Sequence, residues 1–152
     1  MKRLLLALAV VLLGACDLST EIANEPTDPA TETFAAGLKV DISTMTKTAA
    51  GTYYKDFKVG TGTPLTGLPN VVLSYSEFLK DASVVGSALS VTQSLGALIP
   101  GLQDGMQGML PGGERLIVVP SALGYGNLTN IPGVPPNSTL VYDMIFNSLA
   151  VQ

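Results

Sequence analysis

The sequence of 152 residues is 47% hydrophobic and 13% charged, with eight Lys and Arg against twelve Asp and Glu. It contains no histidine and one cysteine, which excludes Ser-His-Asp and Cys-His relays and gives no support to a disulfide or a Cys-ligated metal. The acidic balance excludes the basic surface that nucleic acid requires, and no motif calls for a metal or another cofactor.

The first sixteen residues have the organisation of an export signal. Lys2 and Arg3 give a positive start, and an apolar run over 4–13 follows, about half as long as a membrane-spanning helix. Leu13-Gly14-Ala15-Cys16 then resembles the lipobox of bacterial lipoproteins, in which the cysteine becomes the acylated first residue. We therefore predict a signal peptide over 1–15 and lipidation of Cys16. The alternative is an ordinary cleaved signal with an incidental cysteine.

Lipidation would place the protein outside the cytoplasm, anchored to a membrane on the periplasmic side or at the cell surface. Without Lys2 and Arg3 the mature chain has six basic and twelve acidic residues, so its surface would not hold to anionic lipid by charge. Residues 17–36 contain five acidic residues, two prolines and no Lys or Arg. This composition is typical of disorder. We predict that 16–36 form the lipidated cysteine and a flexible tether, and that 37–152 form one domain, expected to be monomeric.

The N-terminal half of this domain predicts three strands. Leu38, Val40 and Ile42 alternate with polar residues, as in a half-buried strand. Two further strands are expected at 53–59 and 71–79, and each is followed by turn-forming residues.

The C-terminal half predicts one helix and two strands. Apolar residues recur at helical spacing over 100–110, and proline is tolerated in the first turn of a helix. The β-branched segment 115–119 and the alternating segment 139–149 predict two strands on either side of a long loop, 124–138. Several strands around one helix indicate an α+β fold with a mainly antiparallel sheet.

Four motifs in the C-terminal half occur in a fixed order. They are Leu98-Ile99-Pro100-Gly101-Leu102, Gly112-Gly113-Glu114-Arg115, Val119-Pro120 with Leu123-Gly124-Tyr125-Gly126, and Val134-Pro135-Pro136-Asn137 leading to Tyr142-Asp143. Together they resemble the FKBP-type peptidyl-prolyl cis-trans isomerases, and the segments 53–62 and 71–81 resemble the strands that precede them in that family. The resemblance extends over 51–147. It implies an FKBP-like fold, a five-stranded antiparallel sheet curled over one short helix.

The family's active site is an apolar cleft between helix and sheet. By resemblance, Ile99, Tyr125 and Tyr75 would carry the catalysis, Ile99 through its backbone N–H and Tyr125 through its hydroxyl. The other residues that the resemblance assigns to substrate binding are Val85, Leu98, Leu102, Val134 and Tyr142. Rotation about an X–Pro bond passes through a twisted amide without resonance. A dry cleft that removes water from the planar amide therefore lowers the barrier without a nucleophile, a metal or proton transfer.

The sequence departs from the family's pattern at the cleft. Val85-Gly86 stands where the family usually has a Phe-Asp pair in the cleft wall. Leu102 stands where the family usually has an aromatic residue on the cleft floor. We predict a peptidyl-prolyl isomerase that assists the folding of exported proteins, with their proline-containing segments as partners. The first alternative is a catalytically weak or inactive FKBP-like module that binds peptides as a chaperone. The second is a structural lipoprotein without either activity.

Overall fold

The computed structural model describes residues 25–150. The predicted signal peptide, Cys16 and the first part of the predicted tether lie outside these residues. Within 25–150, no helix has the length and hydrophobicity needed to span a bilayer.

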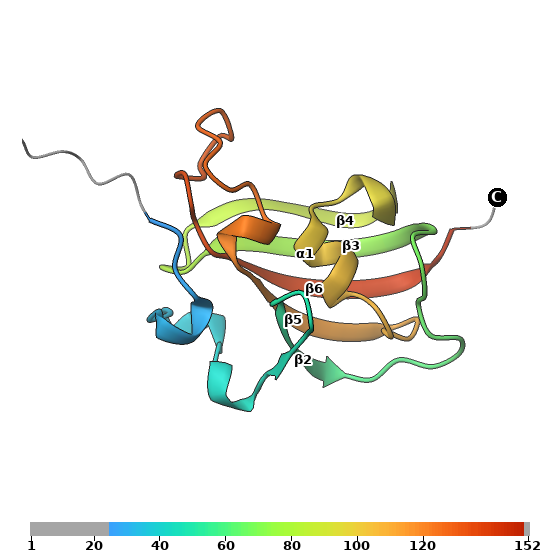
Figure 1. Cartoon of the computed structure of the whole chain (residues 1–152). Coiled ribbons are helices and arrows are strands. Elements are labelled where there is room, and N and C mark those ends of the chain that lie inside the picture. Colours follow the sequence, from blue (N-terminus) through green and yellow to red (C-terminus); the bar gives the residue numbers. More distant parts are fainter. Residues whose placement is uncertain (1–24, 151–152) are drawn as a thin grey trace, which may run out of the picture.

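The domain is a curved antiparallel sheet with one short helix against one face (Figure 1). The sheet has six strands in the order β1-β2-β5-β6-β3-β4. Their bounds are β1 Thr46–Lys47, β2 Tyr53–Lys58, β3 Asn70–Leu79, β4 Val84–Ser94, β5 Gly113–Val119 and β6 Leu140–Leu149. The helix is α1, Pro100–Gly105, and the 3₁₀ helices are η1 Pro29–Thr31, η2 Ala36–Leu38, η3 Ile42–Thr44, η4 Leu95–Ala97 and η5 Ser121–Leu123.

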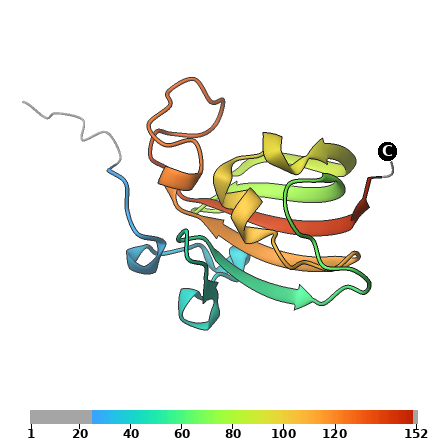
Figure 2. The same ribbon diagram turned by 45° about the vertical axis from the view of Figure 1, so that its right-hand side comes forward.

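The main core lies between the concave face of the sheet and α1 (Figure 2). Alternate residues of β6 point into it, as the sequence predicts: Leu140, Tyr142, Met144 and Phe146 are all buried there. The helix approaches β5 closely because two of its residues are glycines. A Cβ atom at Gly101 would lie 2.3 Å from Cγ1 of Val119. The short helix is therefore fixed to the middle of the sheet.

Arg115 fastens the end of α1 to the sheet. Its guanidinium donates to the carboxylate of Asp56 on β2, with Nε 2.7 Å from Oδ1. Through Nη1 it also donates to the carbonyls of Gly105, at 2.8 Å, and Gln107, at 3.0 Å. These carbonyls lie at the last residue of the helix and just beyond it, where the backbone has no intrahelical donors. One buried side chain thus satisfies the helix end and links it to β2 and β5.

The strand predicted at Leu38, Val40 and Ile42 is wrong. The segment forms the 3₁₀ turns η2 and η3 instead, separated by Lys39 in the left-handed conformation, with φ 55°. The side chain of Asp41 caps η3 by accepting from the N–H of Ser43. The alternating apolar side chains pack on the opposite face of the sheet from α1, in a second cluster with Leu116, Val118 and Val141.

The predicted flexible tether also needs correction for its described part. From Asp28 onward the chain packs on the domain. Glu32 accepts a hydrogen bond from Thr139 and forms an ion pair with Lys80, with 3.1 Å between Nζ and Oε2. The N–H of Ala35 donates to the carbonyl of Lys80 at 2.8 Å. The domain therefore begins several residues before 37, because partners distant in the sequence hold this polar segment in place.

Three further differences concern element number and length. The sheet has six strands and not five, since the two-residue β1 adds to its edge. The long strand β4 is not among the predicted elements. Its side chains are mostly exposed, so no hydrophobic alternation marks it. The helix ends at Gly105, earlier than predicted, and Gly108 follows at a φ of 75° that ends helical winding.

Candidate functional site

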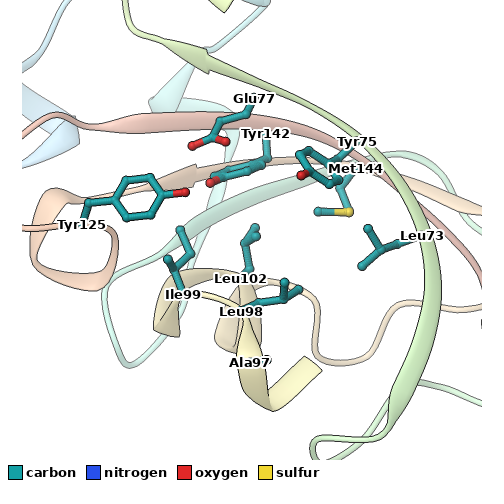
Figure 3. A pocket seen from close by; sticks show the side chains of 10 residues that line it. All are labelled: Leu73, Tyr75, Glu77, Ala97, Leu98, Ile99, Leu102, Tyr125, Tyr142 and Met144. Atoms are coloured by element: carbon teal, nitrogen blue, oxygen red, sulfur yellow. The ribbon is translucent and has the colours of Figure 1, made fainter. Parts of the chain in front are cut away.

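A cavity of about 190 Å³ lies between the concave face of the sheet and the N-terminal side of α1 (Figure 3). We call it the cleft. Its lining comes from β3, β6, the segment 97–102 and the loop that follows η5. The lining residues are Leu73, Tyr75, Glu77, Ala97, Leu98, Ile99, Leu102, Tyr125, Tyr142 and Met144.

Ile99 stands at the start of α1 as its N-cap, with an extended backbone, φ −58° and ψ 148°. The following Pro100 favours this extended conformation, because its ring excludes helical geometry at the preceding residue. The carbonyl of Ile99 accepts from the N–H groups of Leu102 and Gln103. Its own N–H has no acceptor within residues 25–150. A free donor is thus present at the rim of the cleft.

The backbone that carries Ile99 is held by one side chain of the helix. The amide of Gln103 donates from Nε2 to the carbonyl of Leu98, at 2.7 Å, and to that of Gly96, at 3.2 Å. Leu102, one helical residue earlier, is buried and forms the floor of the cleft. The positions of the floor and of the free N–H are therefore coupled through α1.

Tyrosines form the opposite wall. The rings of Tyr75 on β3 and Tyr142 on β6 lie with their centroids 6.1 Å apart and tilted by 56°. Such tilted aromatic pairs are favourable and rigid. Tyr125 approaches from the loop after η5, and Figure 3 shows its hydroxyl directed toward that of Tyr142.

A carboxyl group lies beside these hydroxyls. Glu77 is directly opposite Tyr142 in the β3–β6 ladder and is only 6% exposed. Burial raises the pKa of its carboxyl, while the hydroxyls of Tyr142 and Tyr125 act in the opposite direction. Burial likewise raises the pKa of both tyrosines, and the negative charge of Glu77 adds to this rise. Both hydroxyls therefore stay protonated and can donate hydrogen bonds near neutral pH.

The structure brings six of the eight predicted cleft residues together: Tyr75, Leu98, Ile99, Leu102, Tyr125 and Tyr142 all line the cleft. Val134 and Val85 do not. Val134 is buried in the main core, and Val85 on β4 is partly buried against that core. The catalytic and substrate-binding roles of the six stay predictions. Lipidation of Cys16 concerns a residue outside those described.

Four lining residues were missed from the sequence: Leu73, Glu77, Ala97 and Met144. The strand period contains the signal for three of them. Side chains two apart on a strand share a face, so Tyr75 places Leu73 and Glu77 in the cleft, and Tyr142 does the same for Met144.

A short helix packed into the concave face of a curled antiparallel sheet, with an apolar cleft walled by tyrosines, defines the FKBP-like fold. The Escherichia coli protein FkpA, as a crystal structure, superposes with a TM-score of 0.64 at 28% identity, over 69% of this chain and 51% of that one. The crystal structure of AtFKBP13 gives a TM-score of 0.63 at 25% identity, over 70% of this chain and 98% of that one.

The sequence comparisons agree with the fold. Residues 69–146 match the profile of the FKBP-type peptidyl-prolyl cis-trans isomerases. FK506-binding protein 4 of Neurospora crassa is 36% identical over 124 residues, which are 78% of this chain and 26% of that protein. FkpA of Escherichia coli is 31% identical over 100 residues, which are 63% of this chain and 37% of that protein. This chain belongs to the FKBP-type peptidyl-prolyl cis-trans isomerase family, and it spans about a quarter to a third of the length of these two relatives.

Proposed function

We propose that this protein is an active peptidyl-prolyl cis-trans isomerase whose substrates are proline-containing segments of exported proteins. The observation that carries the proposal is the free N–H of Ile99 at the rim of a largely apolar cleft faced by the Tyr125 hydroxyl. Both donors can hold carbonyl oxygens of a bound X–Pro segment while the prolyl ring rests on Leu102.

The proposed mechanism is desolvation with positioning. A planar amide is more charge-separated than a twisted one, so removing water destabilises the planar ground state more than the transition state. The fixed donors keep the segment in the geometry in which the bond turns. Every group in this scheme acts without gaining or losing a proton, which suits a cleft whose tyrosines stay protonated.

The test is an exchange assay on a proline peptide. A shortened chain that lacks residues 1–16 should accelerate cis–trans exchange, measured by NMR line shapes or by a coupled cleavage assay. Leu102→Asp should abolish the acceleration by placing a charge on the cleft floor, with circular dichroism to verify the fold. Binding of proline peptides by the parent without acceleration at high protein concentration would contradict catalysis.

A peptide-binding chaperone module is the second candidate. It is favoured by the aliphatic floor at Leu102 and by the location of Val85 away from the cleft, which leave a less aromatic enclosure than the family's pattern. The same exchange assay separates the two candidates, because a chaperone module would bind proline peptides without turnover.

We also propose that a lipid on Cys16 anchors the protein to a membrane outside the cytoplasm. The support is Leu13-Gly14-Ala15-Cys16 after a short apolar run. Cys16→Ser should move the protein from the membrane fraction to the soluble fraction while the domain stays folded. If the substituted protein sediments with membranes as the parent does, another segment provides the anchor.

A further inference from the structure

Glu77 is the one ionisable carboxyl in the lining of the cleft, whose other members are apolar or tyrosine. Its oxygen Oε1 is buried and has no hydrogen-bond partner within residues 25–150. A buried acceptor atom without a partner is unfavourable by an amount that a bound donor would recover. The hydroxyls of Tyr125 and Tyr142 act on this carboxyl but leave Oε1 unpaired, so this oxygen points to a donor on a ligand.

The neighbouring strand leaves room for this carboxyl. Glu77 pairs with Gly86 on β4, and a Cβ atom at Gly86 would lie 3.6 Å from Oε2 of Glu77. The carboxyl thus lies at van der Waals distance from the place of a side chain at 86. The position at which the family's pattern has an acidic residue is a glycine here, and the adjacent strand carries an acid beside it.

We propose that Glu77 determines the specificity of the cleft, selecting X–Pro segments with a cationic or N–H-donating residue beside the proline and rejecting acidic ones. This inference rests on the proposed function, because it assumes that X–Pro segments enter the cleft. Glu77 is only 6% exposed, so its interaction with a charged side chain is stronger than at an open surface. No cation in the lining neutralises it.

The matched control is Glu114. It stands on β5 opposite Ile145, on the face of the sheet away from the cleft. Glu114→Gln changes the net charge of the protein by the same amount as Glu77→Gln. Any effect of overall charge on a charged peptide would therefore appear equally in both variants.

The experiment measures kcat/KM of the full-length chain, in mild detergent, for three peptides that differ only before proline: Lys-Pro, Gln-Pro and Glu-Pro. We expect the parent to prefer Lys-Pro over Glu-Pro at least threefold, Glu77→Gln to reduce this ratio to near one, and Glu114→Gln to keep it. An unchanged ratio in Glu77→Gln, or an equal fall in Glu114→Gln, would overturn the proposal.

A double variant tests the location of the charge. In Glu77→Gln with Gly86→Asp, the carboxylate returns to the same space from β4, so the preference for Lys-Pro should reappear. If it does not, the selectivity depends on something other than a charge at this place.

Failure of the proposed catalysis can be distinguished from failure of the specificity role of Glu77. If the parent accelerates none of the peptides, catalysis fails, and the dissociation constants of the same peptides, measured by tyrosine fluorescence, replace kcat/KM in the comparison. A Lys-Pro preference in binding that disappears in Glu77→Gln would then still support the specificity role. Equal binding of the three peptides would overturn it.

Discussion

Gly101→Ala tests whether the close contact of α1 with β5 fixes the cleft. A Cβ atom at this position would lie 2.3 Å from Cγ1 and 2.9 Å from Cγ2 of Val119, which is fully buried. Carbon atoms in contact are about 3.5–4.0 Å apart, so the helix and the strand must separate by roughly 1 Å. Neither neighbour is the free end of a flexible side chain, and the strain cannot be relieved by a rotamer change alone.

The expected loss of stability is about 2 kcal/mol. Adding one carbon to a packed core contact destabilises the folded state by roughly 1–3 kcal/mol. Alanine has a better helix propensity than glycine, which offsets up to about 1 kcal/mol of this cost. For a domain of this size, 2 kcal/mol corresponds to a fall of about 5–10 °C in Tm. Because the same helix carries Ile99 and Leu102, the catalytic acceleration should fall with it.

Differential scanning calorimetry measures the change, and Gly37→Ala is the matched control. Gly37 has open space around its Cβ position and no positive φ, so alanine there should leave Tm unchanged. In Gly101→Ala with Val119→Ala, the smaller strand residue removes both clashing atoms. The double variant should therefore lose less stability than the two single variants together, by about 1 kcal/mol or more. A Tm of Gly101→Ala within about 1 °C of the parent would refute the reasoning.

Three further outcomes are expected. Glu77→Gln should raise Tm at pH 8 and leave it unchanged at pH 4. Because the pKa of the Glu77 carboxyl is raised in the folded state, folding is favoured while this carboxyl is protonated. The folded state loses stability as the pH rises through that pKa, and thermal melts between pH 4 and 8 check this. Arg115→Met should cost about 3 kcal/mol in urea denaturation, because Asp56 and the carbonyls of Gly105 and Gln107 lose their donor. A chain that begins at 37 should melt several degrees below one that begins at 25, since the contacts of Glu32 and Ala35 are absent; equal Tm values would show that this segment adds no stability.

The strands with clear apolar patterns could be predicted from the sequence. The segments 53–59, 71–79, 115–119 and 139–149 all form strands within one or two residues of the expected bounds. Their side chains alternate between core and surface or are buried on both faces, so composition and periodicity report the structure directly. Six cleft residues could be placed through the family resemblance because they lie in or beside the short segments that carry that resemblance.

The failures arise where tertiary contacts decide the conformation. β4 is held by pairing with β3 over most of its length, and backbone pairing leaves no trace in a mostly exposed sequence. The segment around Val40 has a strand-like alternation, but a left-handed residue and a capping aspartate turn it into 3₁₀ helices. The acidic segment with Glu32 resembles a tether in composition, yet its carboxylate has partners at Thr139 and Lys80 that no local window contains.

Glu77 shows why a comparison of single sequence positions with the family's pattern can miss a charged group in the cleft. At position 86 the acidic residue is absent, which suggests a cleft without a charged partner. In space, Glu77 lies across the ladder from Gly86, and its Oε2 is 3.6 Å from the place of a Cβ atom at 86. Gly86→Asp alone would therefore place two carboxylates against each other in a site of low dielectric, where like charges raise one pKa or displace one group. Because one carboxylate stays ionised, Gly86→Asp alone should keep the preference for Lys-Pro peptides, and in combination with Glu77→Gln it should restore that preference. Loss of the preference in Gly86→Asp alone would show that the position of the carboxylate, and not only its charge, selects the peptide.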